Sequence, residues 1–408
     1  MVEAHNVSSA LYFYMLTPSE YTQIENDIIA AIDQASAELI DISRDIHAHP
    51  EVMFTERYAS AKLTGKLAEL GFEVERGTAG LETAFVGRTG NTTGPVIGFV
   101  AEYDALPQIG HACGHNLIGT AALAAGWAMS KVMDRLPGQI AVFGTPAEEG
   151  GNGKGKMIDG GAFKGVDAVM MMHGAMENAT KPVFLAVKGM EVIYHGKPSH
   201  AAASPEAGIN ALDAVVQMYN GIAAMRQQVR SDARIHCIIT NGGTAGNIIP
   251  DYASARVAAR ALDMDYVDEL MARLKGCAEA GALATGARLE LKIAPGGGAF
   301  DVASNNPMAD LFGEKLKRFG VPFTERQKDG PASTDFGILS HTVPGIHPLI
   351  QIADFPTTWH TNEFREASWS DRGHEAMLTA AKCMALTALD LLVKPDLLEA
   401  AKADFAKL

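Results

Sequence analysis

The chain has 408 residues, of which 47% are hydrophobic and 20% charged, and its formal net charge is −14. This length exceeds the size at which a single hydrophobic core keeps growing, so we expect two domains. The acidic balance argues against nucleic acid as a partner, because phosphate binding requires a basic surface. Any anionic substrate must therefore be recognised by a few local donors.

The four cysteines are far apart and show no pairing pattern, which is typical of free thiols in a reducing compartment: Cys113, Cys237, Cys277 and Cys383. The apolar patch at residues 10–16 has no basic residues before it and no small-residue cleavage site, so we expect no signal peptide. No apolar stretch approaches the length that spans a bilayer. The composition thus predicts a cytoplasmic protein without a membrane partner.

Apolar residues at helical spacing predict a first helix over residues 21–49 and a second over 56–70, ending at Gly71. Continuous apolar runs predict three buried strands, at residues 96–100, 139–144 and 168–172. Between the first two strands, residues 119–132 are typical of a helix of small residues that packs closely on its neighbours. This alternation indicates an α/β sheet covered on both faces.

The pattern changes near Lys181-Pro182. Strand candidates of mixed or alternating character follow, at residues 185–195 and 234–240. Two long helical segments, 205–230 and 264–283, lie between strand candidates. This order predicts a βαββαβ, ferredoxin-like module with an antiparallel sheet.

The segment Pro295-Gly-Gly-Gly298 is typical of a linker that returns the chain to the first domain. A helix, a strand and a long closing helix are then expected at residues 306–319, 349–352 and 371–393. The predicted fold class is therefore α/β. A main domain with a mostly parallel sheet flanked by helices, residues 1–183 and 296–408, is interrupted by a smaller α+β module, residues 184–295.

Cys113 and His115 follow the predicted strand 96–100, at the edge of the sheet where ligands bind in open α/β folds. On an extended backbone their spacing of two points both side chains the same way. A thiolate and an imidazole together suit zinc and related metals. The alternative is a buried cysteine beside a hydrogen-bonded histidine.

Glu148 and Glu149 follow the predicted strand 139–144. Adjacent carboxylates at a strand end repel each other unless a cation compensates them. Neighbours on a near-extended backbone face opposite ways, so one can ligate a metal while the other faces substrate. Two surface acids on a solvated turn are the alternative.

His173 ends the apolar run 168–172, and His360 follows the predicted strand 349–352 more loosely. Taken alone, each has an ordinary alternative, a core histidine bonded to the backbone or a surface loop histidine. A chance occurrence of Cys, His or Glu in all four segments is much less expected than in any one of them. The sequence therefore predicts a metal centre.

Seven motifs, in order over residues 40–390, resemble those of peptidase family M20, the aminoacylase and glutamate-carboxypeptidase-like metallopeptidases. Within it the chain is most similar to the amidohydrolase subfamily that includes hippurate hydrolases, and its closest likeness is to the aminobenzoyl-glutamate hydrolase and β-alanyl-dipeptidase-like branch. The motifs are His49-Pro-Glu51, Asp104-Ala-Leu-Pro107, His111-Ala-Cys-Gly-His115, Pro146-Ala-Glu-Glu-Gly150, Gly196-Lys-Pro-Ser-His200-Ala, Asn247-Ile-Ile-Pro250 and His360-Thr361.

The resemblance implies two divalent metal ions, zinc or manganese, with cobalt and nickel as further alternatives. The implied ligands are Cys113, His115, Glu149, His173 and His360. Cys113 would lie between the two ions, where many relatives carry a bridging Asp. Glu148 would be the general base and Asp104 would support the metal site.

The resemblance also makes the main domain catalytic and the module a lid and dimerisation domain. His200 would reach into the active site of a partner subunit, which implies a homodimer or higher homo-oligomer. Asn247 and Arg260 would grip the carboxylate of a small substrate. Glu102 and Asn116 depart from the Asp of many relatives, and the loosely matching segment around Asp335 would line the site.

The expected activity is hydrolysis of an amide bond in a small N-acyl or aminoacyl amino acid or dipeptide that carries a free carboxylate. A water shared by the metal ions would attack after Glu148 takes its proton. An amidohydrolase for N-acyl or aryl amides is one alternative. A non-catalytic metal-binding homologue is another, and its signature would be loss of the base or of a ligand.

Overall fold

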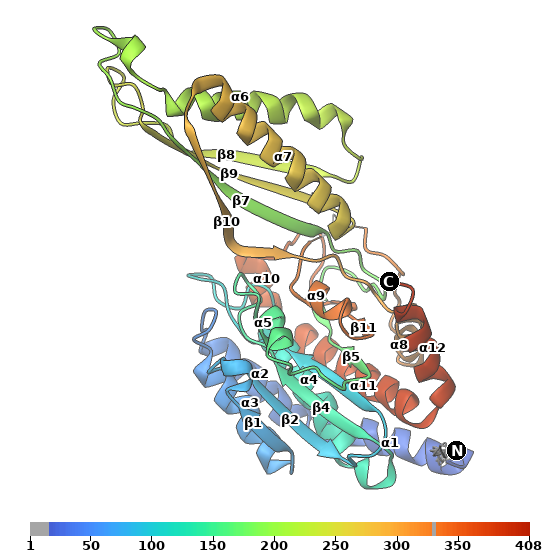
Figure 1. Cartoon of the computed structure of the whole chain (residues 1–408). Helices are drawn as coiled ribbons and strands as arrows, with labels where there is room; N and C mark the ends of the chain where they lie inside the picture. Colours follow the sequence, from blue (N-terminus) through green and yellow to red (C-terminus); the bar gives the residue numbers. More distant parts are fainter. Residues whose placement is uncertain (1–15, 329–331) are drawn as a thin grey trace, which may run out of the picture.

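The computed structural model describes residues 16–328 and 332–408, and within them a main α/β domain carries a smaller sheet at one end (Figure 1). The main sheet has the order β1-β2-β4-β3-β5-β11. Strands β4, β3, β5 and β11 run parallel, with β11 at one edge of the sheet, while β1 and β2 are antiparallel to their neighbours. The strands are β1 (Glu73–Arg76), β2 (Phe85–Gly90), β3 (Val96–Ala101), β4 (Gln139–Gly144), β5 (Ala168–Met170) and β11 (Gly345–Ile346).

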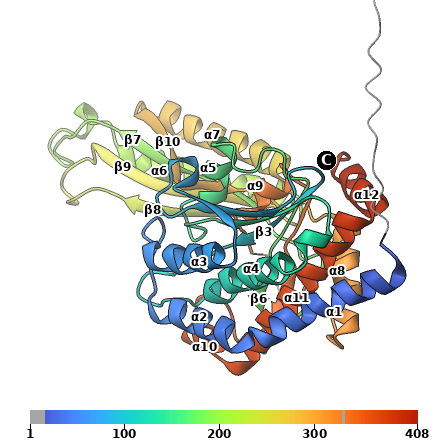
Figure 2. The same ribbon diagram turned by 90° about the horizontal axis from the view of Figure 1, so that it is seen from below.

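Long helices cover the main sheet, and Figure 2 shows α1, α2, α4 and α11 gathered on one side of it. The helices of this domain are α1 (Pro18–Gln34), α2 (Ser36–Ala48), α3 (Arg57–Glu69), α4 (His115–Ser130), α5 (Gly153–Asp159), α8 (Asn306–Arg318), α9 (Phe336–Ser340), α10 (Asn362–Ala367), α11 (Asp371–Val393) and α12 (Pro395–Phe405). Single-turn 3₁₀ helices occur at Thr78–Gly80, Met133–Arg135, Pro205–Ala207 and Arg226–Gln228.

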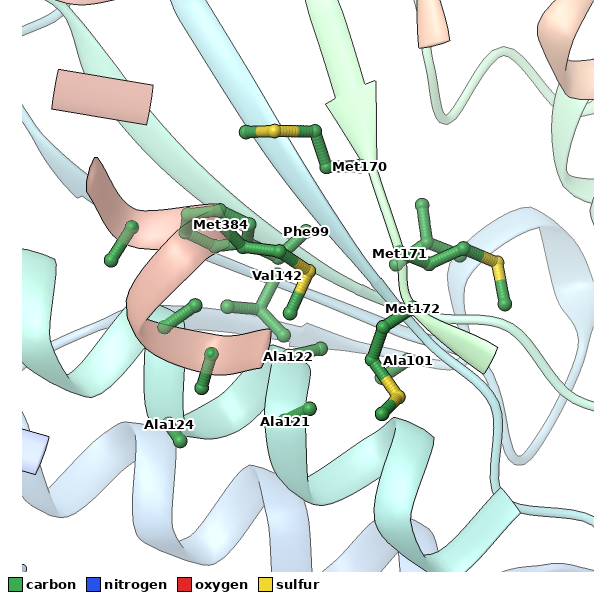
Figure 3. Close-up of a cluster of buried hydrophobic side chains, with 14 of the residues drawn as sticks. Phe99, Ala101, Ala121, Ala122, Ala124, Val142, Met170, Met171, Met172 and Met384 are labelled. Carbon is green, nitrogen blue, oxygen red and sulfur yellow. The ribbon is translucent and has the colours of Figure 1, made fainter. Parts of the chain in front are cut away.

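Small residues on α4 let this helix approach the strands closely. Ala121, Ala122 and Ala124 are fully buried there, beside Phe99, Val142 and Met384 (Figure 3). A Cβ atom added at Gly126 would lie 2.7 Å from Val142 Cγ2, a contact too short for any larger residue. The prediction of a closely packed helix is confirmed, and α4 begins four residues earlier than expected.

Helix α11 corrects an expectation about apolar stretches. Its 23 residues are long and apolar enough to cross a membrane by length and composition alone. However, 72% of its most apolar window is buried inside the protein, against α4, α8 and α1. Helix α11 is therefore a core helix of the main domain.

Two predicted elements are divided in the structure. The expected helix over 21–49 is two helices, because Ala35 (φ −88°, ψ 0°) ends α1 and begins α2. Alanine is an excellent helix former, so the sequence holds no signal for this break. The apolar run 168–172 is strand only to Met170, and His173 belongs to β6 (His173–Ala175), which pairs in parallel with β12 (Leu349–Gln351). Of the apolar N-terminal patch, Leu16 packs against the main core and the rest lies outside the described residues.

The smaller sheet has the predicted βαββαβ order. It is fully antiparallel, with strands in the order β10-β7-β9-β8, and α6 and α7 pack together against it. The elements are β7 (Ala186–His195), α6 (Ala211–Met225), β8 (Arg234–Asn241), β9 (Tyr252–Ala261), α7 (Met264–Thr285) and β10 (Arg288–Ala299). The predicted linker 295–298 is wrong, because β10 continues through it and pairs again with β7 at Gly298 after a register shift.

Side chains alternate across strand β9, as the strand period requires. Ala253, Ala255 and Val257 are buried toward α6 and α7. Ala258 and Arg260, of opposite parity, instead line a cleft shared with the main domain. The inserted sheet therefore presents one face to its own helices, and part of its other face lines this cleft.

Asp390 on α11 is buried and ties three helices together. It accepts hydrogen bonds from Tyr21 Oη at 2.6 Å and Lys394 Nζ at 2.5 Å, and it pairs with Lys315 Nζ at 2.5 Å. Replacing Asp390 with Ala leaves the largely buried Lys315 ammonium unpaired. We expect a loss of about 3–5 kcal/mol in the free energy of unfolding, measured by urea denaturation at pH 7.

The same variant tests a pH dependence. Burial would raise the pKa of Asp390, but hydrogen bonds from Lys315, Lys394 and Tyr21 outweigh it and lower that pKa. The stabilisation is thus complete above the unfolded value of about 3.9 and is lost as the pH falls through the folded value. The difference between wild type and variant should shrink below about pH 4. Glu82→Ala, which breaks the exposed Arg57 pair, is the control and should cost about 0–1 kcal/mol.

Candidate active site

Cys113 and His115 reach one site through a turn and a helix start, not through the extended backbone that we expected. Gly114 adopts a left-handed conformation (φ 81°) that only glycine enters freely, and His115 is the first residue of α4. The Cys113 Sγ atom lies 3.5 Å from His173 Nε2 and 3.7 Å from His360 Nε2. The structure thus places two of the other predicted ligands beside the Cys113 sulfur atom.

Glu148 and Glu149 also differ from the expected opposite orientation. They lie on a tight turn after β4, preceded by Ala147 at φ 62°, and both carboxylates approach the same histidine. His115 Nε2 lies 3.9 Å from Glu148 Oε2 and 4.0 Å from Glu149 Oε1. The second Glu149 oxygen, Oε2, is 3.5 Å from His360 Nε2.

Asp104 holds two of these residues in place. Its Oδ1 atom and its backbone carbonyl lie 3.0 Å and 2.9 Å from His115 Nδ1, and its Oδ2 atom accepts the Glu149 backbone N–H at 3.0 Å. These contacts direct the other ring nitrogen of His115, Nε2, toward the cluster. Asp104 therefore contacts both the His115 ring and the Glu149 backbone.

The cluster fits metal ions. Cys113, His115 and His173 form one set with ligand atoms within 4.8 Å of one another, and Cys113, Glu149 and His360 form a second, so both sets share the Cys113 sulfur. His115 Nε2 and Glu149 Oε1 are buried without a hydrogen-bond partner among the described residues. Such orphaned atoms are costly unless a cation satisfies them.

The protonation states of the cluster follow from its burial. Burial lowers the pKa of His173 to about 4, so this imidazole is neutral and able to ligate. Burial raises the pKa of the Cys113 thiol well above its usual value, and it also raises that of Glu149. His360 differs from its partners, since 55% of its side chain is exposed. Its backbone is left-handed (φ 64°), which is unusual for a residue with a side chain and is typical of functional sites.

Glu148 adjoins a second group of buried charges. Burial, followed by the charges of Glu102 and Asp335, raises the pKa of Glu148 well above its usual value. Lys154 lies behind these carboxylates and contacts both Glu102 and Asp335. A general base poised near neutral pH is commonly built in this way.

A cleft of about 400 Å³ opens in front of Glu148 and Glu149, between the main domain and the inserted sheet. The inserted sheet contributes Arg260, whose Nη1 donates to Ser333 Oγ at 2.8 Å. The cleft is therefore lined by two carboxylates and by a guanidinium. Residues 333–335, of which Asp335 was a sequence candidate, form part of its wall.

His200 and Asn247 lie elsewhere in the same chain. Both are exposed and neither lines the cleft described above, although the Ala201 backbone N–H donates to the Asn247 carbonyl at 3.0 Å. The segment after β7, residues 196–210, lies at the end of the inserted sheet remote from the main domain (Figure 1). One chain thus brings together the predicted metal ligands, Glu148, Asp104 and Arg260, but not His200 or Asn247.

Sequence reasoning missed Lys154. The side chain is completely buried on α5, whereas a lysine in a Gly-rich segment is ordinarily read as an exposed residue. Its partner Glu102 follows β3 directly and Asp335 precedes α9. The signal available in the sequence was the surplus of acids around the strand ends, which one internal cation helps to offset.

A cysteine, three histidines and two glutamates gathered in one cluster, of which the glutamates also line a cleft with an arginine, define a metal-dependent hydrolase centre on an α/β scaffold. A family model of peptidase family M20/M25/M40 matches residues 98–382, and the chain belongs to this family. It is a metallopeptidase-type hydrolase.

Relatives in sequence cover nearly the whole chain. It is 39% identical over 402 residues to Xaa-Arg dipeptidase of Homo sapiens, covering 92% of this chain and 90% of the relative. It is 28% identical over 445 residues to one of the subunits of p-aminobenzoyl-glutamate hydrolase of Escherichia coli, covering 90% of this chain and 92% of that relative.

Solved structures share the fold. A dinuclear metal binding peptidase from the M20 family of Bacillus subtilis matches with a TM-score of 0.69 at 23% identity, covering 88% of this chain and 99% of that one. The aminobenzoyl-glutamate utilization protein of Klebsiella pneumoniae matches with a TM-score of 0.69 at 20% identity, covering 88% and 97%. The two-domain architecture is therefore that of the family.

Proposed function

We propose that this protein hydrolyses the amide bond of a dipeptide or aminoacyl amino acid that carries a free carboxylate. The observation that carries the proposal is the cleft that Arg260 lines together with Glu148 and Glu149. A guanidinium is suited to bind a carboxylate, so it would hold the C-terminal end of the substrate with the scissile bond toward Glu148. The 39% identity to an enzyme named Xaa-Arg dipeptidase supports a dipeptide.

We further propose two divalent cations, held by Cys113, His115 and His173 and by Cys113, Glu149 and His360. When bound, such ions supply Lewis acidity, which lowers the pKa of water and polarises a carbonyl. Zinc suits the thiolate and imidazole ligands, and manganese, cobalt and nickel remain alternatives to be tested by metal analysis.

Side chains of the protein carry out proton transfer and keep the metal ligands oriented. Glu148 takes a proton from the attacking water and returns it to the leaving amine. Asp104 keeps His115 and Glu149 oriented through the hydrogen bonds described above. The inserted sheet forms one wall of the cleft and supplies Arg260 to it.

A panel of substrates tests the proposal. We expect hydrolysis of Xaa-Arg and other aminoacyl dipeptides, and loss of activity on adding a chelator. A dipeptide with an amidated C-terminus should be poorer by about 10–100-fold in kcat/KM, because it lacks the charge that pairs with Arg260. Equal rates on the acid and the amide would contradict the role of Arg260.

p-Aminobenzoyl-glutamate and N-acetyl amino acids complete the panel. p-Aminobenzoyl-glutamate is included because the p-aminobenzoyl-glutamate hydrolase subunit of Escherichia coli aligns with this chain over 92% of its own length. Preference for either class over dipeptides would replace the proposed substrate while keeping the chemistry. No hydrolysis of any substrate by metal-loaded protein would indicate a non-catalytic homologue.

We also propose a homodimer formed through residues 184–295, acting in the cytoplasm. Strand β8 is the outer strand of the inserted sheet and exposes Ile238 (63%) and Ile239 (42%), an apolar edge suited to a second copy. His200 lies remote from the cleft of its own chain, so it would serve the site of a partner. Free thiols support a reducing compartment.

Mixing inactive chains tests the dimer. Co-expressed Glu148→Gln and His200→Ala chains should regain roughly one quarter of wild-type activity, because half of randomly paired dimers then hold one intact site. Each variant expressed alone is the control. If the activity of the co-expressed chains is no greater than the sum of the two controls, His200 acts within its own chain or has no role in the reaction.

A further inference from the structure

Lys154 is a buried ammonium that no step of the reaction has yet used. Its side chain is 0% exposed, and Nζ donates to Glu102 Oε1 and, at 2.5 Å, to Asp335 Oδ1. Its backbone N–H donates to Asp335 Oδ2 at 3.1 Å. Burying an ammonium is costly unless it is paired, and here it joins two carboxylates, one at a strand end and one at a helix start.

The partners of Lys154 crowd Glu148. One oxygen from each of Glu102, Glu148 and Asp335 lies within 4.8 Å of the others. The free oxygen of Glu102, Oε2, has no hydrogen-bond partner among the described residues and lies 3.7 Å from His115 Nε2. Three carboxylates so close together repel one another unless a cation lies among them.

Lys154 is that cation. Its Nζ atom contacts two of the three carboxylates directly. Burial would lower the pKa of Lys154, but Asp335 and then Glu102 outweigh it and raise that pKa, so the side chain carries its charge. The acidic group beside Glu148 is thus offset by an internal ammonium.

We propose that Lys154 is a positioning residue of the hydrolytic reaction, which holds Glu102 and Asp335 apart from Glu148 so that the Glu148 carboxylate stays directed into the cleft. This inference rests on the proposed function. Glu148 and Asp335 line the cleft, whereas Lys154 does not, so it acts through its partners and not on the substrate.

Two uncharged variants test the proposal. Lys154→Met keeps the length of the side chain, and Lys154→Gln keeps one hydrogen-bonding group. For protein that binds as much metal as wild type, we expect kcat on a dipeptide to fall about tenfold or more with KM within about threefold, because a misplacement of about 1 Å costs up to 10²-fold. A crystal structure of the variant should show the Glu148 carboxylate displaced by a similar distance.

Lys315→Met is the matched control. Lys315 is also a largely buried ammonium paired with a carboxylate, Asp390, at 2.5 Å, but it lies between α8 and α11, away from the cleft. This variant should lose thermal stability while its kcat stays within about twofold of wild type, as expected for a purely structural pair. All variants are assayed well below their unfolding midpoints, with metal content measured on the same samples.

The outcomes separate the inference from the proposed function. If wild type hydrolyses no substrate of the panel, the proposed function fails and the inference fails with it. If wild type is active and either Lys154 variant binds metal but retains more than about one fifth of its kcat, the positioning role alone is wrong. If neither Lys154 variant folds or binds metal while Lys315→Met does, Lys154 serves folding and the positioning role is also wrong.

Discussion

Glu148→Gln is expected to lower kcat by about 10²–10⁴-fold, the usual contribution of a general base, while metal stays bound. Gln has the size of Glu but cannot accept the proton of an attacking water. Glu148 belongs to neither of the two sets that share Cys113, so its replacement leaves those ligands intact. The effect should therefore fall on kcat, with little change in metal content.

The neighbouring residue supplies the control. Glu149 lies 3.5 Å from His360 and belongs to the set formed with Cys113, so Glu149→Gln should lose metal as well as activity. Measuring both metal content and kcat for the two variants distinguishes the general base from the metal ligand, although the two residues are adjacent in the sequence. Undiminished activity of Glu148→Gln would show that Glu148 is not the general base. Loss of metal from that variant would show that Glu148 is a metal ligand instead.

The fold could be predicted from the sequence where apolar periodicity is strong. Strands β3 and β4 and helices α8 and α11 lie where the pattern placed them, because continuous burial leaves a continuous apolar run. Strand β1, at the edge of the sheet, is short and largely exposed, and the second half of β2 is also partly exposed, so neither leaves such a run. The Gly-rich segment 295–298 was misread because its pairing with β7 depends on a distant strand, which local turn chemistry cannot reveal.

The cluster of candidate ligands could be predicted because all five residues come from segments that follow strands of one domain, β3, β4, β5 and β12. Their orientations could not be predicted, since these depend on the turn at Gly114 and on the left-handed backbone of Ala147 and His360. The surplus of acids indicated an internal cation but did not identify Lys154. Its burial results from tertiary contacts with Glu102 and Asp335, which come from distant parts of the chain.

Cys113→Ala is expected to abolish the metal centre. Cys113 Sγ is the one ligand atom common to both sets, so its removal leaves His115 with His173, and Glu149 with His360. Loss of a residue that merely orients a ligand weakens metal binding by about 10–100-fold, and loss of a shared ligand should exceed this range. We therefore expect less than one metal ion per chain after dialysis, and kcat at least about 100-fold below wild type.

Cys383→Ala is the control, because it shows what the loss of a buried thiol alone does to stability, metal content and kcat. Cys383 is also buried, at 0% exposure, but it lies on α11 within the main core and belongs to neither ligand set. Its replacement should cost about 1 kcal/mol of stability through lost packing and leave metal content and kcat unchanged. If Cys113→Ala instead retained two metal ions and behaved like Cys383→Ala, the Cys113 sulfur would contribute only to packing. Another group would then have to bridge the two metal ions. The Glu149 carboxylate, which lies between His115 and His360, is the nearest candidate.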